Sequence, residues 1–305
     1  QEKGKAYSDP AKVDEDYALQ GEYSGEVQTQ DGDLKVGAQV IALGEGKFKL
    51  VGFHGGLPGD GWNGSEKREA EASRTGGRAE FEFDGNSVVL ERGSIVITGG
   101  DGTRRGELKK VDRKSPTLGK KPPEGAVVLF DGKNTDAWEK ARMTDDGLLM
   151  QGVTSKQKFG SHSLHIEFRL PYMPAARGQQ RGNSGIYLQG RYEVQMLDSF
   201  GLEGKNNECG GIYTIAEPKV NMCFPPLAWQ TYDIDYTAAV YEGGKKTKNP
   251  RVTVKHNGVT IHDNIELTHA TTASPLKEGP EPGPVYLQDH GNPVRYRNIW
   301  VVEKK

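Results

Sequence analysis

The chain has 305 residues, with 40 lysines and arginines against 42 aspartates and glutamates, and a formal net charge of −2. This balance gives no indication of a nucleic acid or an anionic membrane as partner, and no apolar run reaches the roughly 18 residues of a membrane-spanning helix. Glycine is abundant, with 41 residues, while hydrophobic residues make up only 34%. This composition favours many short strands joined by tight turns over a helical bundle.

The first 113 residues predict a polar leader followed by a small β domain. Residues 1–19 are charged and polar, and we expect them to form a flexible leader. Residues 20–113 contain strand-like pieces separated by Gly, Asn and Asp, among them "AEFEFDGNSVVLE", in which Asp-Gly is typical of a hairpin turn. A small antiparallel β domain is therefore predicted over 20–113, and it contains no motif that points to a chemical role.

A linker and a second β domain follow. Residues 114–125, "KSPTLGKKPPEG", crowd Pro, Gly and Lys together and predict a linker. From residue 126 strands dominate again, and in "SLHIEFRLP" apolar and polar residues alternate as they do in a strand with one buried face. Eight or more strands with almost no helix predict an all-β, two-sheet sandwich of the jelly-roll type over 126–305. Cys209 and Cys223 are either bridged or two buried thiols, and the sequence leaves this open.

Long polar side chains occupy one face of each of three predicted strands. In "RYEVQMLD", Arg191, Glu193 and Gln195 alternate with apolar neighbours. Solvent exposure explains one such face, but three of them with few lysines favour a ligand groove. The other two polar faces consist of His165, Glu167 and Arg169, and of Gln288 and His290. Candidates for hydroxyl binding or sugar stacking are Asn183, Ser184, Tyr187, Tyr213 and Trp229.

Several familiar site types are not expected. No G-x-S-x-G motif is present, the histidines are scattered and the cysteines lack C-x-x-C spacing, which argues against a serine hydrolase and a tight zinc site. The glycine-rich stretches lack phosphate-binding spacing, so no nucleotide or organic cofactor is expected. A divalent cation held by a carboxylate, an amide oxygen and one histidine needs no local motif, and such a site stays open.

The spacing Glu193-x-Gln195-x-x-Asp198 is similar to the E-x-D-x-x-E pattern of some glucanases with lectin-like sandwiches. However, an amide occupies the middle position, and Glu193 and Asp198 share a face only if a bulge intervenes. A retaining glycosidase needs two carboxyl groups roughly 5 Å apart. A conventional glucanase is therefore not predicted, although Asp198 remains a candidate site residue.

Six motifs in the second half of the chain together resemble the 3-keto-disaccharide hydrolase domain family over about residues 124–303. They are "VVLFDGKNTDAW", "GNSGIYLQG", "YEVQMLDS", "CGGIYTIAEP", "WQTYDIDY" and "YLQDHGNPVRYRNIW". The resemblance implies a concanavalin A-like jelly roll, an exported bacterial protein and a carbohydrate substrate. It leaves the oligomeric state open.

The substrate class that the resemblance implies permits an unusual reaction. A ketone at C3 acidifies the C2 proton, so a base can remove it to form an enediolate, and the aglycone then leaves from C1 by β-elimination. Addition of water completes a net hydrolysis. The reaction needs a general base, a group that stabilises the enediolate and a proton donor for the leaving group.

Carried onto the matching positions, the resemblance implies roles for the polar residues. Glu193 is the preferred base, His290 the preferred acid or base, and both are candidate ligands of a divalent cation. Glu167 is the second candidate carboxylate, and Arg191 is a candidate for stabilising the enediolate. The residues expected to orient hydroxyls are Asn183, Gln195 and Gln288. The alternative is a non-catalytic carbohydrate-binding module, because lectin-like sandwiches serve both functions and the fold does not decide between them.

Overall fold

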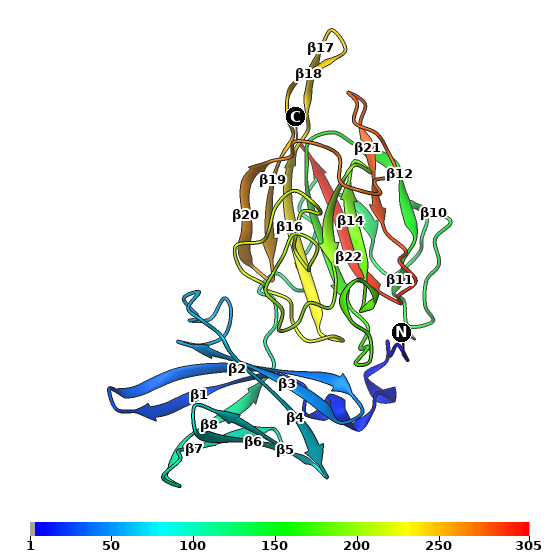
Figure 1. Ribbon diagram of the computed structural model, residues 1–305. Coiled ribbons are helices and arrows are strands. Elements are labelled where there is room, and N and C mark those ends of the chain that lie inside the picture. Colours follow the sequence, from blue (N-terminus) through cyan, green and yellow to red (C-terminus); the bar gives the residue numbers. More distant parts are fainter. Residues whose placement is uncertain (1–3, 305) are drawn as a thin grey trace. The chain divides into compact units, whose positions relative to one another are not determined.

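The computed structural model describes residues 4–304 of the chain and is built almost entirely from antiparallel strands (Figure 1). The expectation of an all-β protein is confirmed. The chain divides into two compact units, residues 4–113 with 173–177 and residues 114–172 with 178–304. None of the helices in the described residues has the length and apolar character to cross a membrane.

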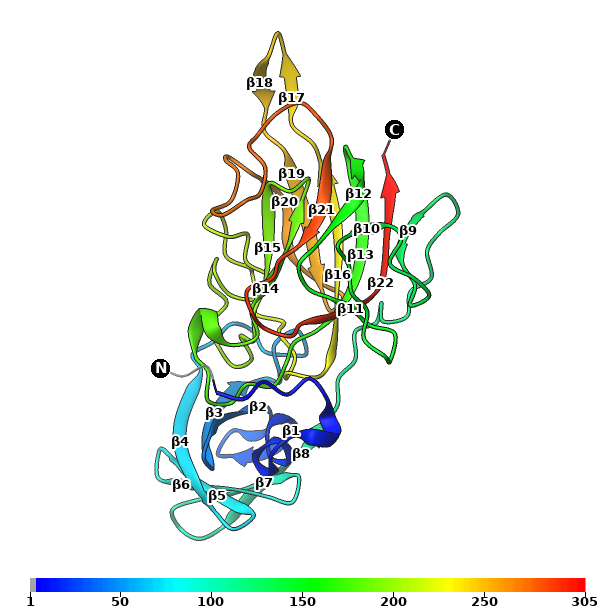
Figure 2. The ribbon, with the colours of Figure 1, turned by 90° about the vertical axis from the view of Figure 1, so that its right-hand side faces the viewer.

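The first unit is a closed barrel of eight strands that pair in chain order, with β1 completing the circle against β8 (Figures 1 and 2). The hairpin predicted at "FDGN" joins β5 to β6. Asp84 (φ 48°) and Gly85 (φ 75°) both lie in the left-handed region that such turns require. The strands are β1 (Gly21–Thr29), β2 (Gly32–Gly44), β3 (Lys47–His54), β4 (Arg68–Thr75), β5 (Arg78–Phe83), β6 (Asn86–Glu91), β7 (Ser94–Thr98) and β8 (Arg104–Val111).

The barrel interior follows from the alternation of the strands. In β5, Ala79 and Phe81 are buried while Glu80 and Glu82 are exposed. The same period of two places apolar side chains inward on the other strands. The largest fully buried side chains of the barrel are Tyr23, Phe48, Phe53 and Phe81.

The residues before the barrel are more ordered than the flexible leader predicted over 1–19. They form two short 3-10 helices, η1 (Pro10–Lys12) and η2 (Glu15–Ala18). Asp16 is buried and accepts hydrogen bonds from the Gly46 backbone N at 2.9 Å and from Arg74 Nε at 2.6 Å. The polar composition of this segment indicates that it forms no long helix or strand. It does not exclude a buried, hydrogen-bonded side chain such as Asp16 that fixes the segment to the barrel. Residues 1–3 of the predicted leader lie outside the described residues.

The segment predicted as a linker over 114–125 packs onto the second unit along its first half. Ser115 Oγ lies 2.6 Å from Thr231 Oγ1, Thr117 Oγ1 donates to Asp233 Oδ2 at 2.6 Å, and the Gly119 backbone N donates to a Glu167 oxygen at 2.6 Å. Prolines and glycines exclude a helix or strand here, but the hydroxyl and backbone groups still bind the sheet beneath them.

The second unit contains two main antiparallel sheets (Figure 2). The five-stranded sheet has the order β10 (Trp138–Glu139), β12 (Val153–Phe159), β21 (Gly283–Leu287), β14 (Ser184–Leu188) and β15 (Tyr192–Met196). The seven-stranded sheet has the order β11 (Leu149–Met150), β22 (Arg295–Glu303), β13 (His162–Arg169), β16 (Trp229–Thr237), β19 (Arg251–His256) and β20 (Val259–Glu266), with β9 (Val127–Phe130) also paired to β22. The remaining elements are the hairpin of β17 (Val240–Glu242) and β18 (Lys245–Lys248) and the 3-10 helix η3 (Gly178–Gln180).

One buried apolar cluster joins the two sheets. It contains Ile166 and Phe168 from the seven-stranded sheet together with Ile186 and Val194 from the five-stranded sheet. Because successive side chains on a strand point to opposite faces, the polar residues between them project away from this shared core. The outer faces of the two sheets therefore point to opposite sides of the sandwich, and this decides which polar residues can meet.

Cys209 and Cys223 are buried free thiols in this structure, the second of the two alternatives that the sequence left open. The Sγ atom of Cys209 lies 3.3 Å from the hydroxyl of Tyr232, another member of the core.

Candidate functional site

The outer face of the five-stranded sheet presents a row of three polar side chains from adjacent strands. Tyr286 of β21 is the register partner of Tyr187 of β14, which in turn pairs with Glu193 of β15. Residues in register on one face of a sheet are in contact distance. Tyr187 and Glu193 are buried, and Tyr286 is half-buried.

A second row runs beside the first. Gln195 is the register partner of Gly185, whose carbonyl accepts a hydrogen bond from the Gln288 backbone N at 2.9 Å. A Cβ atom on Gly185 would lie only 2.0 Å from Glu193 Oε1. The Glu193 carboxylate therefore occupies the space above Gly185, and any side chain there would displace it. We refer to Tyr187, Glu193, Gln195, Gln288 and Asn183 as the Glu193 cluster.

The carboxylate is held by one side-chain hydrogen bond. The Tyr187 hydroxyl donates to Glu193 Oε2 at 2.7 Å and accepts from Gln288 Nε2 at 3.0 Å. Glu193 Oε1 and Gln288 Oε1 are buried, and no donor among the described residues reaches either atom. Unpartnered buried oxygens are rare in folded proteins and call for an explanation. Here they leave acceptors available to a substrate.

Burial sets the protonation of this site. Glu193 is only 2% exposed. Burial raises the pKa of Glu193, and the hydrogen bond from Tyr187 lowers it. Burial is the larger effect, and the pKa of Glu193 is about 7. Burial, and after it the negative charge of Glu193, raises the pKa of Tyr187, so the phenol stays protonated and donates. A carboxylate with a pKa near 7 is a stronger base than an exposed one, and much of it is still ionised at neutral pH.

The backbone around Glu193 is fixed from two directions. The chain at 210–213 runs along the free edge of β15, with hydrogen bonds from Gln195 N to Gly211 O at 2.9 Å and from Tyr213 N to Glu193 O at 3.2 Å. The Glu193 N–H donates to Thr271 Oγ1 at 3.0 Å. These bonds cover a strand edge that would otherwise be unpaired, and they hold the carboxylate in place.

An amide network continues from Gln195. Gln195 Nε2 donates to Asn183 Oδ1 at 2.9 Å, and Asn183 Nδ2 donates to the Gln179 carbonyl at 2.8 Å. The Asn183 backbone N donates to Asn292 Oδ1 at 2.7 Å. Gln195 and Asn183 are thus joined to each other, and Gln288 is joined to the carboxylate through the Tyr187 hydroxyl, while their role in orienting hydroxyls stays a prediction.

Arg191 and Asp198 are bonded elsewhere. Arg191 donates to the carbonyls of Lys277 at 2.8 Å and Glu281 at 2.9 Å, so it braces the loop before β21. Asp198 forms a buried ion pair with Arg181, with 2.7 Å between Oδ2 and Nε. The structure does not bring either side chain to the Glu193 carboxylate, and the role in enediolate stabilisation predicted for Arg191 has no contact to support it.

Glu167 lies on the other side of the sandwich. It projects from β13 on the outer face of the seven-stranded sheet, where it binds Arg297 Nε at 2.7 Å and Asn298 Nδ2 at 2.8 Å. The apolar core separates it from Glu193. The prediction that three polar faces form a single groove is therefore wrong, because Glu167 and Glu193 lie on different sheets. Strand alternation shows which residues avoid the core, but not which sheet a strand joins.

The face around Glu167 is a separate cluster of charges. His165 Nδ1 lies 2.9 Å from Asp233 Oδ1, and the indole of Trp300 stacks on the His165 ring at 5.2 Å between centroids. Burial raises the pKa of Asp233, but hydrogen bonds from His165 and Thr117 outweigh it and lower this pKa to about 2. The cluster anchors the segment 115–120 to the sheet. Trp229 also belongs to this side, because its ring centroid lies 4.0 Å from the Arg297 guanidinium carbon.

We expect this cluster to contribute acid-sensitive stability. Because the folded pKa of Asp233 lies below its usual value near 4, its contribution is present above pH 4 and is lost as the pH falls toward 2. Asp233→Asn should lower the free energy of unfolding at pH 7 by about 2 kcal/mol and flatten its fall between pH 4 and 2, measured by denaturant titration at each pH. Asp235→Asn, at an exposed position of the same strand, is the matched control. Equal profiles for the two variants would refute this.

His290 lies on the loop that follows β21 and is exposed. The alternation that placed it beside Gln288 ends with the strand at Leu287, and the chain then turns, with Asp289 Oδ1 accepting from the Gly291 N–H at 2.8 Å. His290 makes none of the hydrogen bonds of the Glu193 cluster, so its role as a proton donor stays a prediction. Tyr213 is half-buried on the segment beside β15.

Three residues of this site were missed in the sequence: Tyr286, which packs against the Tyr187 ring, and Gly185 and Thr271, which lie against the Glu193 side chain and backbone. Tyr286 was detectable, because it precedes Gln288 by two positions and so shares its face. Gly185 and Thr271 had no local signal, since the first matters only through the neighbouring strand and the second comes from a distant loop.

The fit of a divalent cation can be judged from the donor atoms. Within residues 4–304, no group of three His, Cys, Asp or Glu side chains could hold a metal ion. The unpartnered oxygens of Glu193 and Gln288 are of the hard type that Mg²⁺ and Ca²⁺ prefer. Because the chain offers so few such ligands here, a cation at this site would need substrate oxygens and water as its other ligands.

Removing the Tyr187 hydroxyl should change the acidity of Glu193. Because this hydrogen bond lowers the pKa of Glu193, Tyr187→Phe should raise it above about 7. If Glu193 acts as a base, the acidic limb of the pH profile of kcat/KM should move to higher pH by up to about one unit. Tyr241→Phe, on the β17–β18 hairpin, is the control. An unshifted limb in Tyr187→Phe would exclude Glu193 as the titrating group.

Comparison with known proteins adds to this geometry. Residues 125–302 match the family model described as the 3-keto-alpha-glucoside-1,2-lyase-like domain. A crystal structure of a "putative glycosyl hydrolase" from Parabacteroides distasonis is 36% identical with a TM-score of 0.55, covering 60% of this chain and 85% of that one. A second structure so described, from the same organism, is 19% identical with a TM-score of 0.44, covering 60% of this chain and 95% of that one. No curated protein matches the chain.

Proposed function

Because the chain belongs to the 3-keto-alpha-glucoside-1,2-lyase-like family, we propose that it is an enzyme that cleaves 3-keto-glycosides by removal of the C2 proton and β-elimination of the aglycone. The family and the relative at 36% identity support a protein that acts on carbohydrates. The concanavalin A-like jelly roll and export from the cell belong to the same proposal.

In the proposed reaction, the electron pair of the C2–H bond forms the C2–C3 double bond of an enediolate. When the enediolate collapses back to the ketone, the C1–C2 double bond forms and the bond from C1 to the aglycone oxygen breaks. The released aglycone oxygen takes up a proton. Water then adds its hydroxyl to C1 and a proton to C2, so the sum is hydrolysis of the glycoside. No nucleophile on the protein is needed, which agrees with a site that has one carboxylate and not a pair.

The observation that carries the proposal is the state of Glu193. Its Oε1 atom is buried and unpartnered, and its pKa is about 7. A base of this kind suits the abstraction of a proton made acidic by an adjacent ketone. Gln195, Gln288 and Asn183 offer amide groups for the sugar hydroxyls, and the half-buried rings of Tyr213 and Tyr286 offer apolar surface for the pyranose ring.

Two further roles complete the proposal. His290, two residues after Gln288, is the proposed proton donor to the leaving oxygen. Glu193 and His290 are also the candidate ligands of a divalent cation, which would supply Lewis-acid stabilisation of the developing negative charge; in that arrangement Glu193 would be a ligand in place of the base.

The test uses 4-nitrophenyl 3-keto-glucoside, in both anomeric forms, with release of 4-nitrophenol as the measurement. We expect turnover of the 3-keto substrate, no turnover of the unoxidised 4-nitrophenyl glucoside, and exchange of the C2 proton with deuterium from heavy water. His290→Asn should slow release of the aglycone more than C2 exchange. A parallel arm with chelator measures the contribution of a cation.

The alternative is a carbohydrate-binding module without catalysis. It is favoured if the protein binds the 3-keto-glucoside, releases no 4-nitrophenol, and shows the same affinity after Glu193→Gln. Turnover of the unoxidised glucoside would instead identify a conventional glycosidase.

A further inference from the structure

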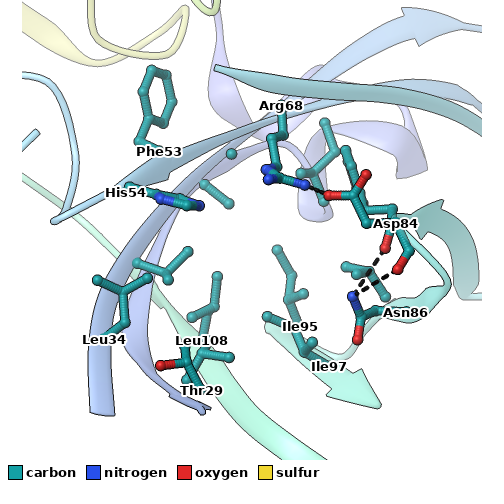
Figure 3. Close-up of a pocket in the computed structure, with 17 residues that line it drawn as sticks. Thr29, Leu34, Phe53, His54, Arg68, Asp84, Asn86, Ile95, Ile97 and Leu108 are labelled. Atoms are coloured by element: carbon teal, nitrogen blue, oxygen red, sulfur yellow. Dashed lines mark hydrogen bonds and ion pairs between the residues drawn. The ribbon is translucent and has the colours of Figure 1, made fainter. Parts of the chain in front are cut away.

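The interior of the N-terminal barrel contains a cavity that the proposed reaction does not use. Its volume is about 330 Å³, within the range of small-molecule sites. Figure 3 shows the lining side chains pointing toward one open space. The apolar part of the lining consists of Val27, Leu34, Val36, Ala38, Leu50, Val88, Ile95, Ile97 and Leu108.

The cavity results from an uneven distribution of large side chains. Tyr23, Phe48 and Phe81 are fully buried in the barrel but do not line the cavity, whereas its wall, which also contains Phe53 and Phe83, includes the small residues Ala38 and Gly52. An eight-stranded barrel is either filled by its own side chains or holds one small ligand. In this barrel, the part around Tyr23, Phe48 and Phe81 is filled by its own side chains, and the part around Ala38 and Gly52 leaves space for a ligand.

Gly52 supports the interpretation that this part of the barrel holds a ligand. Its backbone does not lie in the left-handed region, and a Cβ atom there would have only ordinary contacts, the nearest at 3.7 Å from the Arg68 carbonyl oxygen. The fold therefore tolerates a side chain at this position. Its absence leaves volume inside the barrel that the chain itself does not fill.

The opening of the cavity is polar, and the two charged side chains that line it, Arg68 and Asp84, pair with each other. A second hollow of about 550 Å³ adjoins it and shares His54, Arg68, Phe83 and Asp84. Arg68 forms an ion pair with Asp84, and Lys49 Nζ lies 2.6 Å from a Glu69 oxygen. A charged head group would have to compete with these pairs, whereas hydroxyl groups can donate to the carboxylates and accept from Arg68.

We propose that the barrel binds a small amphipathic molecule, with an aliphatic or aromatic body inside the cavity and an uncharged, hydroxyl-bearing head group at the Arg68–Asp84 opening. The body removes apolar surface from water, and each additional buried methylene should strengthen binding about fourfold until the cavity is full. This site is independent of the reaction proposed for Glu193.

The experiment is isothermal titration calorimetry on the full chain with alkyl β-D-glucosides from methyl to hexyl. We expect affinity to rise with chain length, and hexanoate and hexylamine to bind at least tenfold more weakly than hexyl glucoside. Affinity that does not change with chain length would overturn the proposal. Equal binding of the three hexyl compounds would overturn the assignment of an uncharged head group.

Substitutions that fill the cavity test whether the ligand binds inside the barrel. Val88→Phe fills the cavity and should weaken hexyl glucoside binding at least tenfold, while Val89→Phe, at the next position with its side chain on the outer face, should not change it. Gly52→Leu provides a second filling variant if Val88→Phe does not fold, as judged by circular dichroism. Unchanged binding in the filling variants, or loss in Glu193→Gln alone, would place the ligand outside the barrel and overturn the proposal.

Discussion

Replacing Glu193 by glutamine is expected to slow the proposed turnover of 3-keto-glucosides strongly and at the same time to stabilise the second unit at alkaline pH. Loss of a general base lowers kcat/KM by about 10²–10⁴-fold, and the amide keeps the volume and the acceptor for Tyr187. Because the folded pKa of Glu193 is about 7, the carboxylate is destabilised by burial whenever it is ionised. The measurements are 4-nitrophenol release from the 3-keto-glucoside and unfolding by denaturant.

The sign of the stability effect follows from the two protonation states. An exposed glutamate ionises near pH 4.5, so between pH 4.5 and 7 the unfolded chain loses its proton while the folded chain keeps it, and the native protein loses stability as the pH rises. Glutamine does not titrate. The variant should therefore be more stable by up to about 3 kcal/mol at pH 8 and nearly equal to the native protein at pH 4. A variant that is less stable at pH 8 would show that the carboxylate is not destabilised by burial.

Gly185→Ala is expected to lower the proposed turnover of 3-keto-glucosides about 10²-fold without altering any chemical group of the site. The new methyl group would lie 2.0 Å from Glu193 Oε1, well inside contact distance, so the carboxylate must move. A displacement of about 1 Å at a reacting group costs roughly 10²-fold in rate. The pKa of Glu193 should change with it, so the acidic limb of the pH profile should shift as kcat/KM falls.

The matched control for this substitution is Gly160→Ala in the same unit. A Cβ atom at Gly160 meets nothing within 4 Å, and its backbone does not lie in the left-handed region. This control should keep native activity and stability. Native activity in Gly185→Ala would show that the position of the carboxylate above Gly185 does not matter for the reaction.

The alternation of "RYEVQMLD" was sufficient to predict that Glu193 and Gln195 avoid the core while Val194 and Met196 enter it, and the structure agrees. The period of two is a local property, and so it can be read from a single strand. The pairing of Glu193 with Tyr187 and the approach of Gly185 depend on the register between strands, which no local pattern contains.

Glu167 shows most clearly what strand alternation in the sequence cannot predict. Its strand has the same alternation as the Glu193 strand, and the two looked equivalent in the sequence. Which sheet a strand joins is decided by long-range pairing, and β13 pairs with β16 and β22, not with β14 or β15. His290 was misplaced for a different reason: Gln288 still bonds to Gly185 of β14 through its backbone N, but the chain turns at Asp289, and alternation does not continue through a turn.

The position of β22 has a consequence for the order in which the two units can form. All pairings between barrel strands are made by residues before 112, and each strand pairs with its neighbours in the chain apart from the closure of β1 on β8. In the seven-stranded sheet, β22 follows all its partners in the chain yet lies between β13 and β11 and also pairs with β9. During synthesis the barrel therefore has every strand it needs long before the sandwich does. Until Arg295–Glu303 emerges, the edges of β13, β11 and β9 that pair with β22 are open, and this interval is when the second unit is most exposed to aggregation.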